Sequence, residues 1–153
     1  LEKARSDSSR KYSIVRSGNI FGSSGSVIEK WQQQIKNNNR ITITDPEMTR
    51  FFTNVDSLVR FMIGVLENSE TEKIYIPYQK VIKLKDLARC VIDLFGDANT
   101  KIEVMGLRKG ERPDEKLFFE GEKVVTNLNV GYSRDADMMS LEDIKGLLNS
   151  MQS

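Results

Sequence analysis

One stretch, Ser13–Val27, limits the possible folds of this chain more than any other. It opens as an apolar run, passes through three glycines and a series of serines, and leads into a helical pattern. The apolar residues of that pattern recur at the spacing of one helix face: Val27, Ile28, Trp31 and Ile35. The stretch therefore predicts a strand, a tight turn and a helix over residues 26–37.

A turn of this kind can bind an anion. The first N–H groups of a helix have no intrahelical partner, and the helix dipole places partial positive charge there. Ser23, Ser24 and Ser26 would add short hydroxyl donors, and the glycines would let a ligand approach the main chain. The same pattern also fits a plain connection between a strand and a helix, so both interpretations stay open.

The glycines also invite comparison with a dinucleotide-binding turn. Gly18, Gly22 and Gly25 precede a helix, and a second predicted strand, Ile41–Thr44, ends at Asp45. The spacing, however, is G-x-x-x-G-x-x-G, whereas the dinucleotide fingerprint is G-x-G-x-x-G. This difference argues against a complete nicotinamide site in the stretch.

Composition excludes several classes of function. The 153 residues suffice for one domain with a sizeable core, and a net charge of +1 gives no bias toward nucleic acid or anionic membranes. Histidine is absent, which excludes histidine bases and histidine-ligated metals, and we expect no metal site. The single cysteine, Cys90, lies in an apolar helical pattern typical of a buried thiol. No stretch approaches the length of a membrane span, and no signal peptide is visible; the expected location is the cytoplasm.

Strands alternate with helices along the rest of the chain, which indicates an α/β fold. Strands are predicted over residues 41–44, 73–77 and 102–105, with further strand content at 81–82 and 123–126. One helix is predicted over residues 84–95, ending at Gly96. A last helix follows the capping box at Ser140, and its buried face consists of Leu141, Ile144, Leu147 and Leu148.

Residues Met48–Phe52 are predicted to lead into a strong helix. Thr53 and Asp56 have the spacing of a capping box at its start. The apolar stripe of this helix consists of Val55, Leu58, Val59, Met62, Ile63 and Leu66. Such a stripe is typical of a helix that packs against a core.

Three further features could carry chemistry. Arg50 stands at the junction before this helix, and Arg108 and Glu111 lie in a glycine-containing charged loop, Gly106–Glu115. Arginine forks match phosphate oxygens, and a neighbouring carboxylate can accept ribose hydroxyl protons. The pair Asp114 and Glu115 could do acid–base work. Each feature also fits a solvated charged surface, and the carboxylate pair also fits the start of a helix.

Three segments together resemble one protein family in order and spacing: Arg16–Ile28, Ile41–Phe52 and Gly106–Glu111. That family is the polysaccharide-biosynthesis branch of the extended short-chain dehydrogenase/reductases, which includes UDP-N-acetylglucosamine 4,6-dehydratases and related epimerases. The closing segments Gly131–Asp135 and Ser140–Ile144 are similar to the C-terminal end of the family. The resemblance therefore covers nearly the whole chain.

The resemblance implies roles for individual residues. Residues matching Asn19 and the Ser26–Val27 turn contact the diphosphate and neighbouring parts of a nucleotide sugar, and the strand matching Ile41–Thr44 lies near the uracil. The arginines matching Arg50 and Arg108 bind the diphosphate, and the acid matching Glu111 holds the ribose. The implied substrate-binding residues are Asn19, Ser26, Val27, Thr44, Met48, Thr49, Arg50, Arg108 and Glu111, and Ser17 would lie near the nicotinamide of the cofactor.

The chain departs from the family at several positions. The family usually has tyrosine at Ser17, Arg-Pro-Gly-Glu at Arg108–Glu111, and histidine before glutamate at Asp114–Glu115. Its catalysis also requires an N-terminal glycine-rich cofactor turn and a Tyr-x-x-x-Lys pair. None of the four tyrosines here is followed by lysine four residues later. In the family this pair would lie just upstream of Leu1, and Leu1–Arg5 is similar to the end of a helix.

The sequence thus predicts an α/β fold: the C-terminal, substrate-binding portion of an extended Rossmann-type enzyme. Short strands, four to five helices and no full dinucleotide-binding sheet are expected, with residues 1–153 as a single domain. The expected function is to bind a UDP-sugar for an NAD(P)-dependent 4,6-dehydratase or epimerase. The alternative is a non-catalytic nucleotide-binding or assembly module.

The expected partners follow from the same interpretation. NAD or NADP would serve the parent enzyme, with neither expected on these residues alone, and neither nucleic acid nor a membrane is expected as a partner. Ile14, Val15 and Ile20 would face water in an isolated chain. We therefore expect either a homo-oligomer or contact with a missing N-terminal half.

Overall fold

The computed structural model describes residues 12–68, 70 and 73–151. These residues contain four α-helices: α2 (Val27–Asn38), α3 (Val55–Asn68), α4 (Leu84–Phe95) and α5 (Leu141–Ser150), together with the 3-10 turn η1 (Ser133–Asp135). None of the described helices has the length and apolar character needed to cross a bilayer. The predicted helix end at Leu1–Arg5 lies outside the described residues.

Eight short strands form three small sheets in the described residues. In the first sheet β1 (Ile14–Val15), β5 (Ile74–Ile76) and β8 (Val124–Thr126) are parallel. In the second, β2 (Asn19–Ile20) is parallel to β4 (Thr49–Thr53), which is antiparallel to β6 (Lys80–Lys83). The third consists of the parallel strands β3 (Arg40–Ile43) and β7 (Lys101–Val104). The predicted α/β class with short strands is confirmed.

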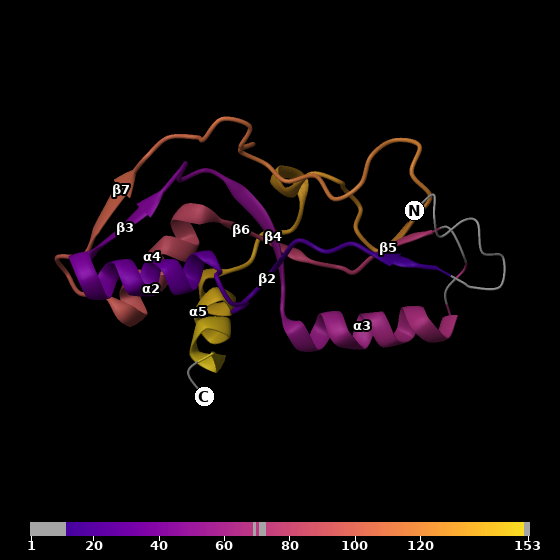
Figure 1. Cartoon of the computed structure of the whole chain (residues 1–153), viewed down its shortest axis with the longest axis horizontal. Coiled ribbons are helices and arrows are strands. Elements are labelled where there is room, and N and C mark those ends of the chain that lie inside the picture. Colours follow the sequence, from indigo (N-terminus) through magenta and orange to yellow (C-terminus); the bar gives the residue numbers. More distant parts are fainter. Residues whose placement is uncertain (1–11, 69, 71–72, 152–153) are drawn as a thin grey trace.

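Figure 1 shows how these sheets are arranged. The β3–β7 pair lies at one end of the molecule with α2, α4 and α5, and the β1–β5 strands lie at the other end with α3. The β2, β4 and β6 strands lie between the two ends, and the long segment after β7 runs along the top of the view toward β5. Strand β4 therefore occupies the middle of the molecule.

Strand β4 takes part in both hydrophobic cores. Side chains alternate between the two faces of a strand, and here Phe52 is buried in the larger core while Phe51 is buried in the smaller one. Strand β6 repeats the alternation with Ile82 and Val81. The helices contribute to the larger core the residues Ile28, Trp31, Ile35, Leu87, Ala88, Cys90, Val91, Ile144 and Leu148.

The predicted helices α2, α4 and α5 are confirmed, with caps that the sequence indicated. Ser26 is the N-cap of α2, and Gly96 ends α4, where its N–H donates to the carbonyl of Ile92. Ser140 and Asp143 form the predicted capping box of α5. Of the four residues predicted to form the buried face of α5, Ile144 and Leu148 are buried, Leu147 is half-buried, and Leu141 is exposed.

The stretch Ser13–Val27 forms two strands rather than the single predicted one. Its halves pair in different sheets, β1 with β5 and β2 with β4. The break lies at Gly18, whose N–H donates to Gln79 Oε1 over 2.8 Å and where an added Cβ would lie 2.5 Å from Phe51 Cβ. The prediction of a continuous strand is wrong because the main chain at Gly18 packs directly on β4.

A second correction concerns the segment before α3. Residues Thr49–Thr53 form β4, a strand that pairs with β2 and β6, and this strand leads into the predicted helix, α3. The helix begins after Asn54, whose side-chain Oδ1 accepts a hydrogen bond from the Ser57 N–H over 2.7 Å. The predicted capping box of Thr53 and Asp56 is therefore wrong, and Asn54 caps the helix instead.

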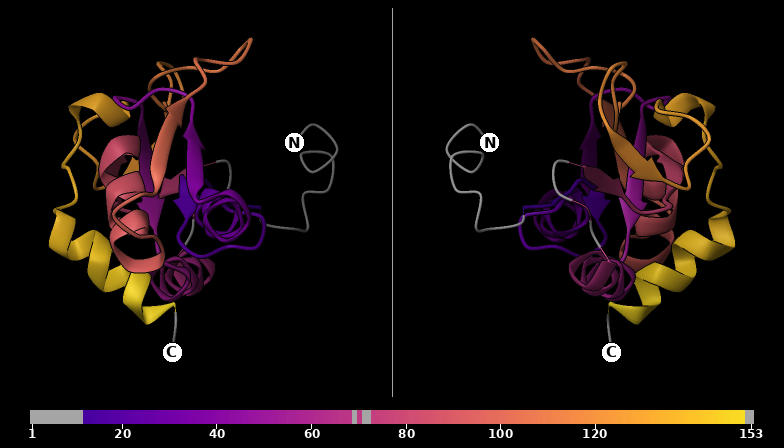
Figure 2. Two further views of the ribbon diagram at one scale, coloured as in Figure 1. Left: turned by 90° about the vertical axis from the view of Figure 1, so that its left-hand side faces the viewer. Right: turned by 90° about the vertical axis from the view of Figure 1, so that its right-hand side faces the viewer.

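Helix α3 leaves most of its apolar stripe uncovered. Leu58 and Val65 are its buried residues, and Phe61 is half-buried. Five further large apolar side chains are between 44% and 82% exposed: Met62, Val59, Ile63, Val55 and Leu66. These side chains share one helix face. In Figures 1 and 2, α3 lies along β1 and β5 at the end of the molecule. Ile14, Val15 and Ile20, which were expected to face water, are half-buried, whereas five apolar side chains of α3 are exposed.

An ion pair joins the end of β1 to a distant segment. The Arg16 guanidinium binds both carboxylate oxygens of Glu122, Nη1 to Oε2 over 2.8 Å and Nη2 to Oε1 over 2.9 Å. Arg16 Nη1 also donates to the carbonyl of Leu117 over 2.8 Å. The Arg16 hydrogen bonds, and then the Phe119 N–H, lower the pKa of Glu122 to about 2.

We expect Gly18→Ala to lower the free energy of unfolding by about 1–3 kcal/mol, the usual cost of overpacking. The added methyl group would press on the main chain of Phe51, which cannot shift without disturbing both cores. Chemical denaturation measures the change. Gly146→Ala in α5 is the matched control, since its Cβ would meet nothing within 4 Å; it should raise stability by about 0.5–1 kcal/mol. Wild-type stability in Gly18→Ala would contradict the close packing.

We expect the contribution of Glu122 to stability to depend on pH. Its pKa is lower in the folded chain than the ordinary value of 4.5, so the ion pair stabilises the fold above about pH 4.5 and this stabilisation is lost as the pH falls toward about 2. Denaturation of wild type and Glu122→Gln at several pH values should therefore show a difference at neutral pH that disappears near pH 2. A difference of constant size at all pH values would show that packing, rather than charge, sets the effect.

Candidate functional site

The carboxyl ends of β3 and β7 form the edge at which most predicted site residues gather. The two strands are parallel, with Ile43 opposite Val104, and the Met105 N–H donates to the Ile43 carbonyl over 2.8 Å. Two segments leave this edge next to each other: one from Thr44 toward β4, and the charged loop from Gly106. Ligands of parallel α/β sheets bind outside the carboxyl ends of the strands, which makes this edge the first candidate for a site.

The charged loop brings Arg108 and Glu111 into one turn. The Arg108 N–H donates to Glu111 Oε2 over 3.1 Å, and the Glu111 N–H donates to the Arg108 carbonyl over 2.9 Å. Gly110, with φ 84°, supplies the left-handed residue that this turn needs. Arg108 is exposed and Glu111 is half-buried. The two predicted residues therefore meet, through the main chain of Arg108 rather than its guanidinium.

Arg50 binds the same loop just after Glu111. Its Nη2 donates to the Arg112 carbonyl over 2.8 Å, and its Nη1 donates to the Pro113 carbonyl over 3.0 Å and to the carbonyl of Thr49 over 2.7 Å. The guanidinium thus fastens the base of the loop to β4. Sequence reasoning placed Arg50 and Arg108 at one ligand, and the structure brings Arg50 to the loop that carries Arg108.

Two predicted site residues, Met48 and Thr49, are each only 3% exposed. Thr49 Oγ1 lies 2.8 Å from Asp114 Oδ1 and 2.6 Å from Ser133 Oγ, and its N–H donates to the Pro113 carbonyl over 2.9 Å. Protein atoms therefore enclose both side chains. Thr44, whose Oγ1 lies 3.7 Å from Met48 Sδ, is half-buried at the end of β3.

The loop returns to β4 through Asp114 and Glu115, which lie beside this strand and begin no helix. Glu115 Oε2 accepts a hydrogen bond from the Phe51 N–H over 2.9 Å. Burial raises the pKa of Glu115, while this hydrogen bond and the charge of Arg50 oppose the shift. The N–H of Glu115 in turn donates to Ser133 Oγ over 2.9 Å. Sequence reasoning missed Ser133, since nothing local distinguishes it from other serines.

Asn19 reaches the same strand from the glycine-serine turn. Its Nδ2 donates to the Phe51 carbonyl over 3.1 Å, so Asn19 and Glu115 together satisfy both main-chain groups of Phe51. Ser26 and the half-buried Val27 lie further along, at the start of α2. There Glu29 Oε2 accepts a hydrogen bond from the Gly25 N–H over 2.6 Å, so a carboxylate of the chain itself lies at the helix N-terminus.

Ser17 lies just beyond the carboxyl end of β1, half-buried, with its Oγ 3.2 Å from the Gly18 carbonyl. This is the end of a parallel strand, where a ligand of the first sheet would bind. The described residues contain no group of three or more histidine, cysteine, aspartate or glutamate side chains that could hold a metal ion.

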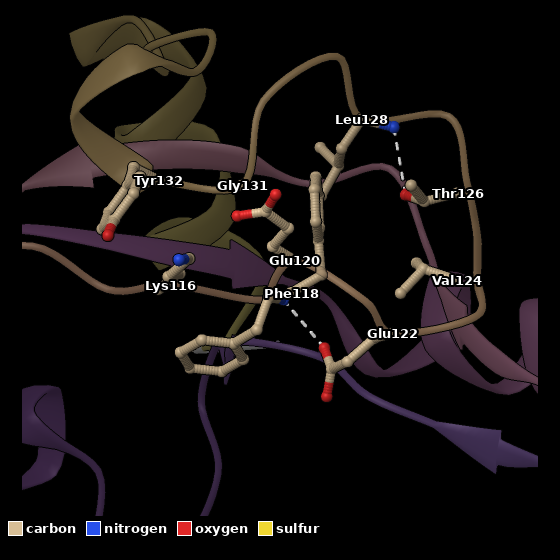
Figure 3. A pocket seen from close by; sticks show the side chains of 10 residues that line it. Lys116, Phe118, Glu120, Glu122, Val124, Thr126, Leu128, Gly131 and Tyr132 are labelled. Carbon is tan, nitrogen blue, oxygen red and sulfur yellow. Dashed lines mark hydrogen bonds between the residues drawn. The ribbon is translucent and has the colours of Figure 1, made fainter.

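A cavity of about 590 Å³ lies beside the return of the loop, against β8 (Figure 3). Lys116 Nζ lies 4.7 Å from the centre of the Phe119 ring and 4.8 Å from that of Tyr132, a cation–π arrangement at the rim. The remaining lining residues are Phe118, Glu120, Glu122, Val124, Thr126, Leu128 and Gly131. No sequence motif pointed to this cavity, because its walls come from side chains whose spacing fits no known site.

The charges at the β3–β7 edge decide what the site can bind. The first part of the loop carries three cations, Arg108, Lys109 and Arg112, and the carboxylate of Glu111, whereas Asp114 and Glu115 lie on its return to β4. Arg50 lies at the base of the loop. Guanidinium groups favour phosphate oxygens, and a carboxylate favours hydroxyl donors. An anionic ligand that also carries hydroxyl groups suits this arrangement.

Comparisons with known proteins give the family. A family model described as "Polysaccharide biosynthesis protein" matches residues 1–134. The UDP-glucose 4-epimerase of Rickettsia canadensis (strain McKiel) is 30% identical over 165 residues, which cover 88% of this chain and 48% of that protein. The chain therefore spans about half the length of this curated relative.

Solved structures of other proteins are similar to this chain. The X-ray structure of Pen from Bacillus thuringiensis is similar with a TM-score of 0.82 and 27% identity, over 99% of this chain and 53% of that one. A UDP-glucuronic acid 4-epimerase from Bacillus cereus, at 15% identity and a TM-score of 0.63 over 99% of this chain and 48% of that one, shares the fold. With a family model that covers most of its length, the chain belongs to the polysaccharide-biosynthesis family of extended short-chain dehydrogenase/reductases.

Proposed function

We propose that this chain is the C-terminal, nucleotide-sugar-binding half of a cytoplasmic, NAD(P)-dependent 4,6-dehydratase or epimerase that acts on UDP-sugars in polysaccharide biosynthesis. The proposal rests on one observation: Arg50 binds the main chain of the loop that carries Arg108 and Glu111, beyond the carboxyl ends of β3 and β7. The relatives support the substrate class: one is named a UDP-glucose 4-epimerase, and another was solved with UDP-4-deoxy-4-fluoro-glucuronic acid and NAD.

The diphosphate would lie between the two arginines. Three of the five N–H donors of Arg50 bind carbonyls, and the remaining two can donate to a phosphate oxygen. Arg108 is exposed on the loop and can bind a second oxygen with its planar fork. Glu111 already accepts one N–H, and its second oxygen can accept a ribose hydroxyl.

The remaining predicted residues would line the rest of the nucleotide sugar. Thr44 lies at the end of β3, on the proposed uracil side. Asn19 donates to the carbonyl of Phe51, which follows Arg50 on β4. A phosphate at the Ser26–Val27 turn would have to displace Glu29 from the Gly25 N–H. Met48 and Thr49 are buried and would support the site rather than touch the ligand.

NAD or NADP, when bound, would supply hydride transfer at the sugar. The glycine turn between β2 and α2 lacks the spacing of a dinucleotide turn, and β1 leads into β2 rather than into a helix. These residues do not build a dinucleotide site by themselves, although Ser17, at the carboxyl end of β1, is proposed to lie near the nicotinamide. Their part in the reaction is to bind the nucleotide and hold the sugar in place.

An N-terminal half of the same protein is the partner that we propose for α3. Five large apolar side chains of this helix are uncovered, and β1 is an edge strand of the parallel sheet within the described residues. The curated relative is about twice as long as the part that this chain matches. Further parallel strands beside β1, with a helix on α3, would cover this surface.

We expect Arg108→Ala to weaken the binding of UDP to the full-length protein by about 10- to 100-fold. A hydrogen bond to a charged group contributes roughly 1.5–3 kcal/mol, and about 1.4 kcal/mol corresponds to a tenfold change. Arg108→Lys should recover little of the affinity, because an ammonium cannot reproduce the planar fork. Titration calorimetry measures all three proteins.

The matched control for this series is Arg40→Ala, an exposed arginine at the opposite end of β3, paired with Glu103. It should leave UDP affinity unchanged. If Arg108→Ala binds UDP with wild-type affinity, the loop is a solvated surface turn and the proposal loses its main support.

We expect the isolated 153-residue chain to show no turnover of a UDP-sugar with NAD, because it contains no Tyr-x-x-x-Lys pair. Product analysis after prolonged incubation measures this, with the full-length protein as the positive control. Sustained conversion by the isolated chain would contradict the proposal that these residues bind the nucleotide sugar without the catalytic pair. A full-length protein that binds UDP and converts no sugar would instead favour the non-catalytic binding module.

A further inference from the structure

A chain of buried hydrogen bonds runs beneath the charged loop. It joins Ser133 on η1, Thr49 on β4 and Asp114 on the return of the loop. Ser133 is 0% exposed and Thr49 is 3% exposed, so water does not compete with the bond between their hydroxyl groups, while Asp114 is half-buried. At the surface, this series of hydrogen bonds ends with Arg134 Nη1, which donates to Asp114 Oδ2 over 3.2 Å.

The direction of each bond follows from the donors available. An ionised Asp114 can only accept, so the Thr49 hydroxyl donates to it over 2.8 Å. Thr49 Oγ1 has then given its one proton, so it accepts from Ser133 Oγ over 2.6 Å; the Thr49 carbonyl, 3.2 Å from Ser133 Oγ, is a second acceptor for the same proton. Ser133 Oγ accepts in turn from the Glu115 N–H over 2.9 Å. The buried relay therefore runs in one direction, from the Glu115 main chain through Ser133 and Thr49 to Asp114.

Each member of the relay fixes a different part of the loop base. Thr49 orients the side chain of Asp114, while Ser133 holds the main chain of Glu115 by two bonds, since the Ser133 N–H also donates to the Glu115 carbonyl over 2.9 Å. Residues 112 and 113 are held by Arg50 and by the Thr49 N–H. Four consecutive residues, 112–115, are thereby fastened directly after Glu111.

We infer that Ser133, Thr49 and Asp114 are positioning residues for nucleotide binding. Fastening 112–115 fixes where the exposed turn of Arg108 and Glu111 emerges, and so fixes the separation of that turn from Arg50. The inference rests on the proposed function for its ligand, and on the geometry of the relay for its mechanism. It gives Thr49 a supporting role through the loop, in keeping with its burial.

A buried relay suits this task better than apolar packing does. Apolar contacts tolerate small shifts of register, whereas hydrogen bonds with fixed donors and acceptors specify one arrangement. Loss of the Thr49 hydroxyl removes the donor to Asp114 Oδ1 and leaves the Ser133 hydroxyl with the more distant Thr49 carbonyl, at 3.2 Å, as its acceptor. The loop base should then move to recover a partner, and the turn of Arg108 should move with it.

The test compares Thr49→Val with Thr49→Ser in the full-length protein. Valine keeps the shape of threonine and removes the hydroxyl, whereas serine keeps the hydroxyl. We expect Thr49→Val to weaken UDP binding about tenfold, the factor that corresponds to one lost hydrogen bond. Thr49→Ser should stay close to wild type. Ser133→Ala should follow Thr49→Val, and Ser57→Ala, on exposed α3, is the matched serine control and should change nothing.

A double-mutant cycle separates positioning from general destabilisation. If Thr49 acts through the loop, Thr49→Val should weaken UDP binding much less in an Arg108→Ala background than in wild type. Additive losses in the double variant, or equal losses in Thr49→Val and Thr49→Ser, would overturn the inference.

Hydrogen exchange keeps the inference testable if UDP is the wrong ligand. Absence of UDP binding to wild type would defeat the proposed function alone. The amides of Glu111 and Glu115 should still exchange faster in Thr49→Val than in Thr49→Ser, because the fastening of 112–115 needs no ligand. Equal exchange in the two variants would overturn the positioning role.

Discussion

The fold depends on the two-sided burial of strand β4. Phe52 points into the larger core and Phe51 into the smaller one, so a single strand joins the two hydrophobic clusters. The main-chain groups of Phe51 bind Glu115 and Asn19, which come from distant parts of the chain. Gly18 packs against the same residue so closely that no side chain fits between them. The candidate site is thus built on the strand that the cores hold most firmly.

The site combines a firm base with an exposed turn. Arg50, together with buried hydrogen bonds at Thr49 and Ser133, fastens the base, while Arg108 lies in a loop that is exposed from Gly106 to Gly110. Firm placement reduces the entropy that a ligand must overcome on binding, and exposure lets the nucleotide reach the cations. This division suits a family in which the cofactor supplies the redox chemistry and the protein supplies orientation.

Sequence patterns predicted the parts of the fold that face a single core. Helices α2, α4 and α5 have one apolar face and clear caps, so periodicity located them. Strand β4 was missed because its residues alternate between two cores and show no single apolar face. The stripe on α3 was recognised, but its periodicity does not reveal that the described residues leave most of it uncovered. The contact between Arg108 and Glu111 could be expected because the two residues are close in sequence, whereas Thr49 and Ser133 are 84 positions apart and only the folded chain reveals their contact.

The ion pair between Arg16 and Glu122 has a consequence for synthesis of the chain. The two residues are 106 positions apart, and β8, the outer neighbour of β5, is made after both β1 and β5. At about 5–20 residues per second, the ribosome needs roughly 5–20 s to bring Glu122 out after Arg16. During that interval the segment around β1 lacks its charged partner and an incomplete sheet edge stays open. Contacts of such long range also slow folding, so the nascent chain should depend on chaperones more than a helical domain of equal length.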